Sequence, residues 1–584
     1  MKNPRLARPD ESFVIGPVFA TVLLSLFCLV FGGCGADATE CIEGTFNCPC
    51  MDGDICDGGL ICVDGVCLHG DDPDGSVIQD GGDGGELDPG EWRLPENHYI
   101  PGKMSMTVVH PREGEAAGWA YAKNAHPNVR WEIPIVVQGG AWPFRYEILE
   151  NGGAEGLEIG GELRREKLDG YVFHRVNPEY GVLWWDDPQE GFYEILVRVE
   201  DQDANTVDVV VSLTVGVEGW VFVDPANGDD ENVGTIDDPF RTVGRVVEEG
   251  AGFANHRVYL HGLVPMDGNR ENGNLRIEEG LAPRVWVGFP GSGAVLEAYE
   301  GKLVLASADF YFANLEHRHR EDFYQQDGSF IHMITVWGDH PRYTVHDVTF
   351  SRFQGDPVNT DLGNSSIMMF TNPDSPRDYV AVVNCTQTGP NGLLTSTYFL
   401  RYSVFEKNRV KNADISLADG SVWSVIFVKG GNNEFLTLRA NEFWEENEWN
   451  AGSGALGLMA ARNIEFAYNV INTPWSAGRR GAMVFWTNSP LADYSWTEDT
   501  PVWVYRNSFK ERLHWEAEAL VNMPDGTVIM ERNVLDTGDW PLSERLQNIE
   551  NLDGASYFDE EMRLTAEARE YLGRYGAEIA VEEP

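Results

Sequence analysis

The sequence predicts an all-β protein in which a β-sandwich and a small disulfide-rich module precede a long parallel β-helix. Three observations support this prediction. Short apolar strands ending at asparagine recur through the second half of the chain, alternating strands fill the stretch before it, and six cysteines crowd near the N-terminus. A chain of 584 residues is too long for one ordinary hydrophobic core, so several domains are expected.

The net charge of the chain limits the kinds of molecule that it can bind. Asp and Glu number 93 against 43 Lys and Arg, which gives a net charge of −50. Because so little positive charge is available to neutralise phosphates, nucleic acid is excluded as a partner. The same field repels anionic membranes and uronate-rich polymers unless a divalent cation bridges the two, which leaves calcium open as a cofactor.

Residues 1–33 have the features of an export signal. Basic residues precede an apolar run over 13–31, and Gly32, Gly33 and Cys34 follow it. The segment resembles a bacterial lipoprotein signal peptide, which is cut before the cysteine that then carries the lipid. The resemblance implies lipidation of Cys34 and an outer-membrane anchor facing the periplasm or the cell surface. An ordinary cleaved signal or an uncleaved anchor helix are the alternatives.

Residues 34–69 are expected to form a module held by disulfides. An even number of cysteines in so short a segment behind an export signal favours disulfides, because too few apolar residues are present to form a core. Zinc is the alternative, but no histidine lies at ligand spacing. The spacing does not choose among the pairings. The module resembles Cys-rich modules of surface proteins in predatory and related Gram-negative bacteria, which supports a surface location. The six cysteines are Cys41, Cys48, Cys50, Cys56, Cys62 and Cys67.

A linker and a β-sandwich come next. Residues 70–103 are acidic, rich in glycine and without hydrophobic periodicity, which predicts a flexible tether. Residues 104–217 contain alternating strands between polar turns, the pattern of a β-sandwich. The strand order resembles bacterial Ig-like or cadherin-like modules, which implies a spacer or adhesion unit without chemistry. Asp201 and Asp203 either bind calcium, as at cadherin junctions, or form a polar turn, and the turn is favoured.

The stretch 220–243, WVFVDPANGDDENVGTIDDPFRTV, predicts a strand, two turns and the start of a short helix. It closely resembles the entry of pectate-lyase-like right-handed parallel β-helix proteins, in which a helix covers the open end of the first coil. The resemblance assigns residues 218–555 to the β-helix. It also makes Asp224, Asn227 and Asp229 turn residues rather than metal ligands.

Asparagines that end successive strands are expected to stack at one corner of the β-helix, where each amide bonds the bent backbone and its neighbours in adjacent coils. The expected members are Asn384, Asn441, Asn469, Asn507 and Asn533, with Asn408 as a further member of unsettled phase. Cys385 should be a buried thiol. The uneven gaps between strands predict inserted loops, where function is expected to lie. Residues 556–584 are expected to form a helical cap, because apolar residues over 559–579 have helical spacing.

Catalytic residues are not evident. Pectate-lyase-like proteins include lyases and hydrolases, but the spaced aspartates and catalytic arginine that identify the lyases have no match here. The densest ionisable stretch contains His317, His319 and Asp322. In a strand the two histidines share one face, so this stretch is a candidate metal or acid–base site. The alternative is solvated loop charge.

A second candidate site lies at 475–486, WSAGRRGAMVFW. Here Arg479 and Arg480, between Trp475 and Trp486, would hold an acidic sugar. Core and loop aromatics explain the stretch almost as well. The sequence therefore favours a non-catalytic surface lipoprotein whose β-helix binds an extracellular glycan or a surface protein. The alternative is a polysaccharide lyase or glycoside hydrolase that acts on extracellular polysaccharide.

Overall fold

The chain divides into two compact units, residues 1–85 and 86–584. The computed structural model describes residues 60–63, 66–69, 92–112, 124–168, 171–254, 256–266, 274–278, 282–298, 302–306, 309–320, 332–336, 341–351, 365–369, 377–388, 393–411, 426–429, 433–444, 456–459, 461–472, 483–486, 501–510, 514–515, 526–535, 551–553, 557–559, 562–565, 568 and 571–582.

The first unit contains one hairpin among its described residues. Strands β1 (Leu60–Val63) and β2 (Val66–His69) pair antiparallel, and Cys62 lies opposite Cys67 in the register. Cys34 and the four cysteines before Cys62 in the predicted module lie outside the described residues. The lipid anchor and the disulfides therefore stay predictions.

Mostly antiparallel strands form the first part of the second unit. Val197 and Val211 from one sheet and Trp131 and Leu183 from another are fully buried in a shared core. The sheets are β4-β13-β12-β7, β5-β11-β8 and the pair β3-β6. The strands are β3 (Thr107–His110), β4 (Asn124–Ala125), β5 (Trp131–Pro134), β6 (Val136–Gln138), β7 (Arg145–Glu150), β8 (Leu157–Ile159), β9 (Arg164–Leu168), β10 (Tyr171–Arg175), β11 (Val182–Trp185), β12 (Gly191–Glu200) and β13 (Thr206–Val215).

The ordered chain before this sandwich begins earlier than expected. Leu94 and Ile100 are buried, and the Arg93 guanidinium donates to the Gln202 carbonyl at 2.7 Å. Residues 92–103 thus belong to the sandwich and not to a free tether.

Asp201 accepts from the amides of Ala141 and Asn205, which agrees with the favoured role as a turn residue.

Residues 220–553 form the predicted right-handed parallel β-helix. Its larger sheet comprises β14 (Trp220–Val223), β15 (Arg257–Leu260), β16 (Leu263–Pro265), β18 (Val285–Gly288), β19 (Val295–Ala298), β21 (Phe310–His319), β23 (Tyr343–Ser351), β25 (Arg377–Asp378), β26 (Val380–Val383), β27 (Thr386–Thr388), β29 (Leu400–Glu406), β30 (Arg409–Lys411), β32 (Glu434–Arg439), β33 (Glu442–Trp444), β35 (Arg462–Ala467), β36 (Val470–Asn472), β38 (Val502–Tyr505), β39 (Ser508–Phe509), β41 (Val528–Glu531), β42 (Asn533–Leu535) and β43 (Asn551–Asp553).

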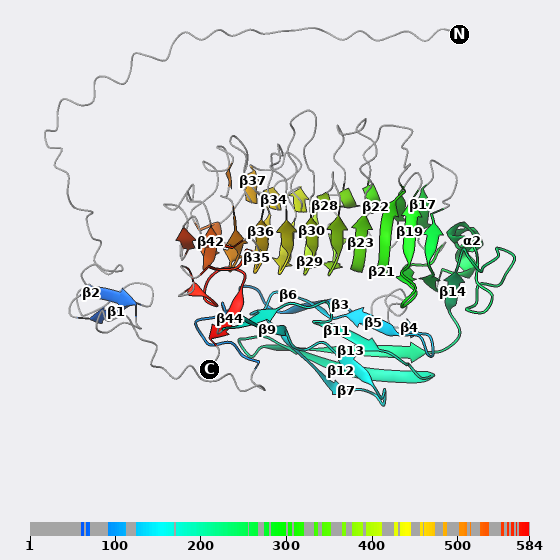
Figure 1. Cartoon of the computed structure of the whole chain (residues 1–584), viewed down its shortest axis with the longest axis horizontal. Helices are drawn as coiled ribbons and strands as arrows, with labels where there is room; N and C mark the ends of the chain where they lie inside the picture. Colours follow the sequence, from blue (N-terminus) through cyan, green and yellow to red (C-terminus); the bar gives the residue numbers. More distant parts are fainter. Residues whose placement is uncertain are drawn as a thin grey trace, which may run out of the picture. The chain divides into compact units, whose positions relative to one another are not determined.

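A second parallel sheet lies on another face of the same coils (Figure 1). Its strands are β17 (Leu275–Glu278), β20 (Leu303–Ala306), β22 (His332–Val336), β24 (Ser365–Met369), β28 (Leu393–Tyr398), β31 (Ile426–Lys429), β34 (Leu456–Met459), β37 (Met483–Trp486) and β40 (His514–Trp515). Leucine, isoleucine, valine and phenylalanine from both sheets fill one continuous core between them. Burial on the inner side of each strand explains the alternating pattern in the sequence.

The entry of the β-helix has the predicted elements. Strand β14 leads to a turn in which Asp224 Oδ1 accepts from the Ala226 amide at 2.9 Å. Helix α2 (Val243–Glu249) follows, with the Thr242 hydroxyl capping the Arg245 amide, and η1 (Gly250–Gly252) continues it. Val243 and Val246 join the core of the first coils. The helical cap and the turn role of Asp224 are therefore confirmed.

The asparagine stack is present, with a corrected membership. Each amide nitrogen of the stack donates to a strand carbonyl of the preceding coil. From Asn441 onward, each side-chain oxygen also accepts from the asparagine one coil back. Asn469 Nδ2, for example, lies 3.0 Å from Leu438 O and 2.9 Å from Asn507 Oδ1. The members that donate in this way are Asn408, Asn441, Asn469, Asn507 and Asn533.

The placement of Asn384 in the stack is wrong. Its side chain is only partly buried and its φ is 55°. Cys385 occupies the stack position in that coil, where its amide donates to Asn408 Oδ1. The reason is that every corner contains two special positions. A residue with positive φ precedes the stack residue, and asparagine is suited to both. Cys385 is a fully buried thiol, as predicted.

The sandwich is packed along the β-helix instead of standing apart from it as a spacer (Figure 1). Outward-facing aromatics of the coils, including Trp220, Tyr259 and Tyr468, share one buried cluster with the sandwich core. The Tyr468 hydroxyl donates to the Trp142 carbonyl at 3.3 Å, and the Arg257 guanidinium donates to the Asn124 carbonyl at 2.6 Å. An interface of this kind fixes the two domains relative to one another.

The C-terminal segment does not form the expected helical cap in its described part. Residues 571–578 are turns and a short 3₁₀ segment, and β44 (Ile579–Glu582) pairs antiparallel with β10 at the edge of the β9-β10 sheet. The helical spacing was misleading because Leu564, Ala568 and Leu572 pack into a small core with Phe173 without needing a helix.

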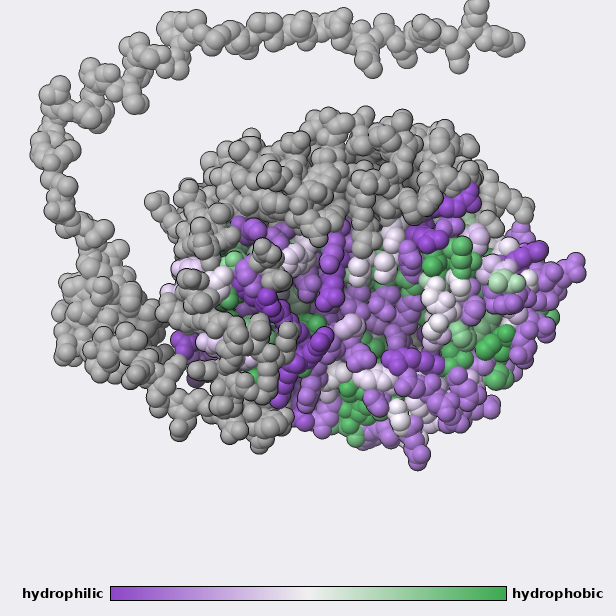
Figure 2. Space-filling view, viewed as in Figure 1, coloured by the Kyte–Doolittle hydropathy of each residue, from purple (hydrophilic) through white to green (hydrophobic). Residues whose placement is uncertain are grey.

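The visible face of the described chain is mostly polar, with small apolar patches (Figure 2). The exposed large apolar side chains of the second unit are dispersed over several strands and loops: Leu149, Phe192, Val217, Val233, Ile236 and Leu263. Among the described residues, no helix has the length and apolar character needed to span a membrane.

A candidate pocket between the sandwich and the β-helix

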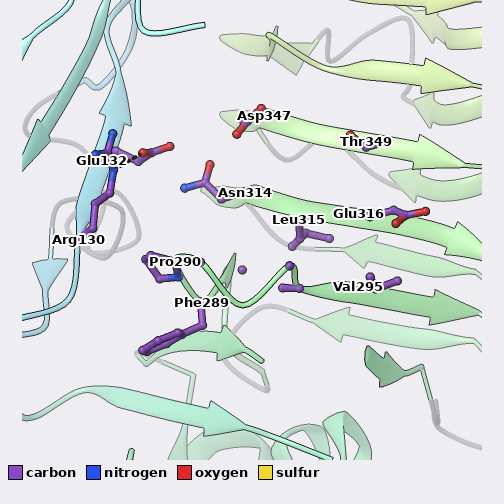
Figure 3. Close-up of a pocket in the computed structure, with 14 residues that line it drawn as sticks. Arg130, Glu132, Phe289, Pro290, Val295, Asn314, Leu315, Glu316, Asp347 and Thr349 are labelled. Carbon is purple, nitrogen blue, oxygen red and sulfur yellow. Dashed lines mark hydrogen bonds and ion pairs between the residues drawn. The ribbon is translucent and has the colours of Figure 1, made fainter. Parts of the chain in front are cut away.

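A pocket of about 430 Å³ opens where the sandwich meets the early coils (Figure 3). One wall is formed by Arg130 and Glu132 at strand β5. The opposite wall is the loop from Phe289 to Val295 between β18 and β19, together with the corners of β21 and β23. Residues from two domains therefore form the site, which is a common position for small-molecule binding.

Glycines shape the loop wall. A Cβ on Gly288 would lie 1.9 Å from the Asn314 carbonyl oxygen, so only glycine permits this approach of two adjacent coils. Gly291 and Gly293 have φ values of 73° and 59°, which turn the chain from β18 into β19. The Phe289 ring beside them is held by edge contacts with Phe222 and Tyr259. The loop is thus fixed by packing.

Carboxylates outnumber cations in the pocket lining. Glu132, Glu316 and Asp347 line it together with a single guanidinium, that of Arg130. Arg130 already donates to Glu132 Oε2 at 3.2 Å and to Asp186 Oδ1 at 2.5 Å. Within the described lining no cation pairs with Glu316 or Asp347, but the charge of Lys407, which lies outside the lining, acts on Asp347 and favours its ionised form.

Asp347 sits at a corner of the β-helix with a φ of 50°. Its Oδ1 accepts from Asn384 Nδ2 at 3.2 Å. The residue is exposed to solvent at this corner, although protein atoms pack around its carboxyl group. Burial, and then the charge of Glu132, raise the pKa of the Asp347 carboxyl to about 6. This carboxyl group therefore exchanges a proton near neutral pH.

Asn314 occupies the corresponding corner one coil earlier, with a φ of 59°. Its Oδ1 atom is buried and has no hydrogen-bond partner. An acceptor left in this state is costly to the folded protein. In Figure 3 the side chains of Glu132, Asn314 and Asp347 approach the same part of the pocket from facing walls.

A buried basic cluster lies behind Asp347. His346 is 1% exposed, and neither of its ring nitrogens has a hydrogen-bond partner. Burial, and then the charges of Lys407 and His110, hold the pKa of His346 well below its usual range. Lys407 donates from Nζ to the Tyr180 carbonyl at 2.5 Å, and burial lowers its pKa to about 8. These groups belong to the interface and not to the pocket lining.

The sequence-predicted histidines lie elsewhere. His317 and His319 share one face of β21, as expected, but that face is the interior of the β-helix. His317 is fully buried, with Nδ1 3.0 Å from Leu296 O and Nε2 3.3 Å from Met333 O. Its ring packs near Phe312 and Phe350. Such enclosure separates the ring from any external substrate and argues against a catalytic role.

The other predicted site residues are not placed. Asp322, Trp475, Arg479 and Arg480 lie outside the described residues, and Trp486 is described only as the last residue of strand β37. Their roles stay predictions. Within the described residues, no group of three or more His, Cys, Asp or Glu is arranged to hold a metal ion.

Sequence reasoning missed the pocket. The corner position of Asp347 could have been predicted from the sequence. Aspartate and asparagine are the non-glycine residues best suited to a positive φ, and Asn314, Asp347 and Asn384 repeat at one corner of successive coils. No sequence pattern predicts that Glu132 lines the pocket, because its position depends on how the sandwich packs against the β-helix.

Comparison with known proteins finds a distant structural likeness. No protein-family model matches the chain, and no curated protein is significantly similar to it. The crystal structure of a GH136 lacto-N-biosidase from Eubacterium ramulus is similar at 10% sequence identity over 57% of this chain and 68% of that chain, with a TM-score of 0.31. A likeness at this level assigns neither a family nor an activity.

Proposed function

We propose that this protein is a surface-displayed lipoprotein that binds an extracellular glycan in the pocket between its sandwich and its β-helix. The observation that carries the proposal is the lining itself. The side chains of Glu132, Asn314 and Asp347 approach one part of the pocket, and Phe289 lies in another part of its lining. Sugar hydroxyls donate hydrogen bonds to carboxylate and amide oxygens, and the apolar faces of sugar rings pack against aromatic side chains.

Pre-formation of the site supports binding. Its volume of about 430 Å³ lies in the range of small-molecule sites. The Phe289 loop is held by ring contacts, and Glu132 is held by Arg130. A ligand that enters would have few side chains to order, which saves conformational entropy on binding.

The lipid anchor is the second part of the proposal. Cleavage before Cys34 and lipidation of its thiol would hold the chain at the outer membrane, with the Cys-rich module and the acidic linker between the lipid and the sandwich. Cells labelled with a fatty-acid probe test this part. Label should be incorporated by the unchanged chain and lost in Cys34→Ala, and continued labelling of the variant would refute the anchor.

Binding is tested on a glycan array with the mature chain, Asp347→Asn and Glu132→Gln. The matched control is Glu194→Gln, which removes an exposed carboxylate on the other sheet of the sandwich. Specific binding that is weakened by the two pocket variants and kept by the control supports the proposal. Binding that is equal in all four proteins would place the glycan site elsewhere.

One observation favours hydrolysis as a second candidate function. Glycoside hydrolases pair a carboxyl group of raised pKa, the general acid, with a second carboxylate that activates water or attacks the sugar. Asp347, with its pKa raised to about 6, faces Glu132 in this way. Lyase chemistry is less well supported, because the pocket carboxylates repel the uronate on which a lyase acts.

Release of reducing sugar distinguishes hydrolysis from binding alone. Any oligosaccharide bound on the array is incubated with the mature chain, and the products are compared with those of Asp347→Asn and Glu132→Gln. Turnover lost in both variants would establish the hydrolase. Binding without turnover leaves the non-catalytic function.

A further inference from the structure

We propose that residues 571–582 form a C-terminal clasp that joins the sandwich to the late coils of the β-helix, and that this clasp closes most tightly when the Glu578 carboxyl group carries a proton. The inference is independent of the glycan-binding function. It concerns a pH-sensitive connection between the two domains.

The clasp is bonded to both domains. On the sandwich side, β44 pairs antiparallel with β10, and Ile579 is buried in the sandwich cluster. On the β-helix side, the Gly576 amide donates to the Arg532 carbonyl at 2.9 Å, and the Ala577 amide donates to the Ser508 hydroxyl oxygen at 2.9 Å. Release of this one segment therefore breaks contacts with both domains at once.

The clasp and the covalent connection lie at opposite ends of the domain interface. Residues 216–219 join β13 to β14 at the first coil, whereas β44 lies beside the last coils (Figure 1). The aromatic cluster holds the early coils to the sandwich whether or not the clasp is closed. Because β44 pairs through only four residues, it can open at a lower free energy than the core strands.

Glu578 is a buried acid within the clasp. It is 7% exposed, Oε2 accepts from the Leu564 amide at 3.4 Å, and Oε1 has no hydrogen-bond partner. An ionised carboxylate in this position places charge on an oxygen that no donor reaches, which is more costly than burial of the protonated group. The geometry of the closed clasp therefore favours the neutral carboxyl.

Charged side chains from the neighbouring elements act on Glu578. Arg506, at the end of β38, donates to its backbone carbonyl, and Arg563 pairs with Asp559 at 2.9 Å. Within the described chain, no cation forms an ion pair with the Glu578 carboxylate itself. Burial raises the pKa of Glu578 to about 7, against the opposing charge of Arg175 on β10 and the smaller opposing charge of Arg563, while Asp559 adds to the rise.

Acid should tighten the clasp, and neutral pH should loosen it. The closed clasp binds the Glu578 proton more strongly than the released clasp, in which the carboxyl has its ordinary pKa of 4.5. The closed state is therefore most favoured below about pH 4.5, and this advantage is lost as the pH rises to about 7. Above about pH 7 the contribution of Glu578 is constant.

The experiment is native-state hydrogen exchange of the mature chain at several pH values, with rates corrected for the intrinsic pH dependence of exchange. The opening constants of fragments 171–175 and 571–582 should rise together by at least about tenfold between about pH 5 and about pH 8. Fragments of β12 and β21 should change less, because they belong to cores that stay closed when the clasp opens.

Variants assign the pH dependence to one carboxyl group. Glu578→Gln keeps the shape of the side chain without its titration, so the clasp should exchange slowly and equally at all these pH values. The matched control is Glu194→Gln, which removes an exposed carboxylate of the sandwich and should keep the pH dependence. Thermal unfolding of each variant checks that it folds.

Two results would overturn the proposal. Exchange of the clasp that is independent of pH in the unchanged chain, or a pH dependence that Glu578→Gln retains, refutes the role of Glu578. Exchange of the clasp, β12 and β21 with one common opening constant shows that residues 571–582 do not open separately, and it refutes the clasp itself.

Discussion

Arg439 Nε donates to Glu406 Oε2 at 2.7 Å, and the two side chains lie almost fully buried between the β-helix and the sandwich. The same guanidinium donates to the carbonyls of Val137 and Gly139 in the sandwich. Its charge is therefore satisfied by both domains at once, and the ion pair depends on their docking.

Loss of Arg439 should undock or unfold the second unit. Arg439→Ala leaves Glu406 buried without its partner and removes the donor to two carbonyls of the sandwich. Removal of one member of a buried ion pair costs about 3 to 5 kcal/mol. Urea unfolding followed by tryptophan fluorescence measures the loss. The control is Arg198→Ala, which breaks an exposed pair with Asp208 and should change little. Equal stability of the two variants would show that the interface does not depend on the buried pair.

The asparagine stack should be energetically important within the β-helix. Asn469 exchanges hydrogen bonds with Asn441 and Asn507, so Asn469→Ala leaves several buried groups unsatisfied. The expected loss is about 2 to 4 kcal/mol of unfolding free energy. Asn472→Ala, in the next strand of the same coil and partly exposed, should stay within about 0.5 kcal/mol of the unchanged protein. If Asn469→Ala lost no more unfolding free energy than the control, water would have replaced the hydrogen bonds of the asparagine stack.

His346 should make the docked state sensitive to acid. Its folded-state pKa is depressed, because burial and the neighbouring Lys407 and His110 disfavour its charge. The unfolded chain therefore binds more protons below about pH 6.5, and the stability that His346 contributes is lost as the pH falls. The raised pKa values of Asp347 and Glu578 act in the opposite direction, so the difference between variants is the informative quantity.

That difference is obtained from His346→Leu. Relative to the unchanged protein, the variant should gain up to about 1.4 kcal/mol for each pH unit below about 6.5. Chemical unfolding at several pH values between about 5 and 8 measures it. Parallel stability curves for the two proteins would show that folding does not depress the pKa of His346.

Strand β44 should hold the edge of the β9-β10 sheet. Ile579 is 2% exposed and packs into the sandwich cluster, and its strand pairs with β10 through Val172 and Phe173. Ile579→Asp buries an unpaired charge and should cost about 3 kcal/mol or more. Hydrogen exchange should accelerate in β10 before it does in β12. Unchanged protection of β10 would contradict this role.

Much of the β-helix could be predicted because its coils repeat. Alternation of apolar residues marked the strands, and Asn441, Asn469, Asn507 and Asn533 occupy the expected corner. Asn384 was misplaced by one residue, because the preceding positive-φ position accepts asparagine equally well. His317 and His319 were recognised as sharing a face, but alternation alone does not say which side of a strand faces the interior.

The sequence by itself determined the all-β class, the start of the β-helix at Trp220 and the residues of its turns and corners, since these depend on local periodicity and on backbone conformations that few residues adopt. Only the tertiary structure decided that the sandwich docks along the coils, that β44 joins β10, and that Glu132 faces Asp347. Such contacts join residues hundreds of positions apart. They are set by the complementarity of two folded surfaces, which leaves no periodic trace in the chain.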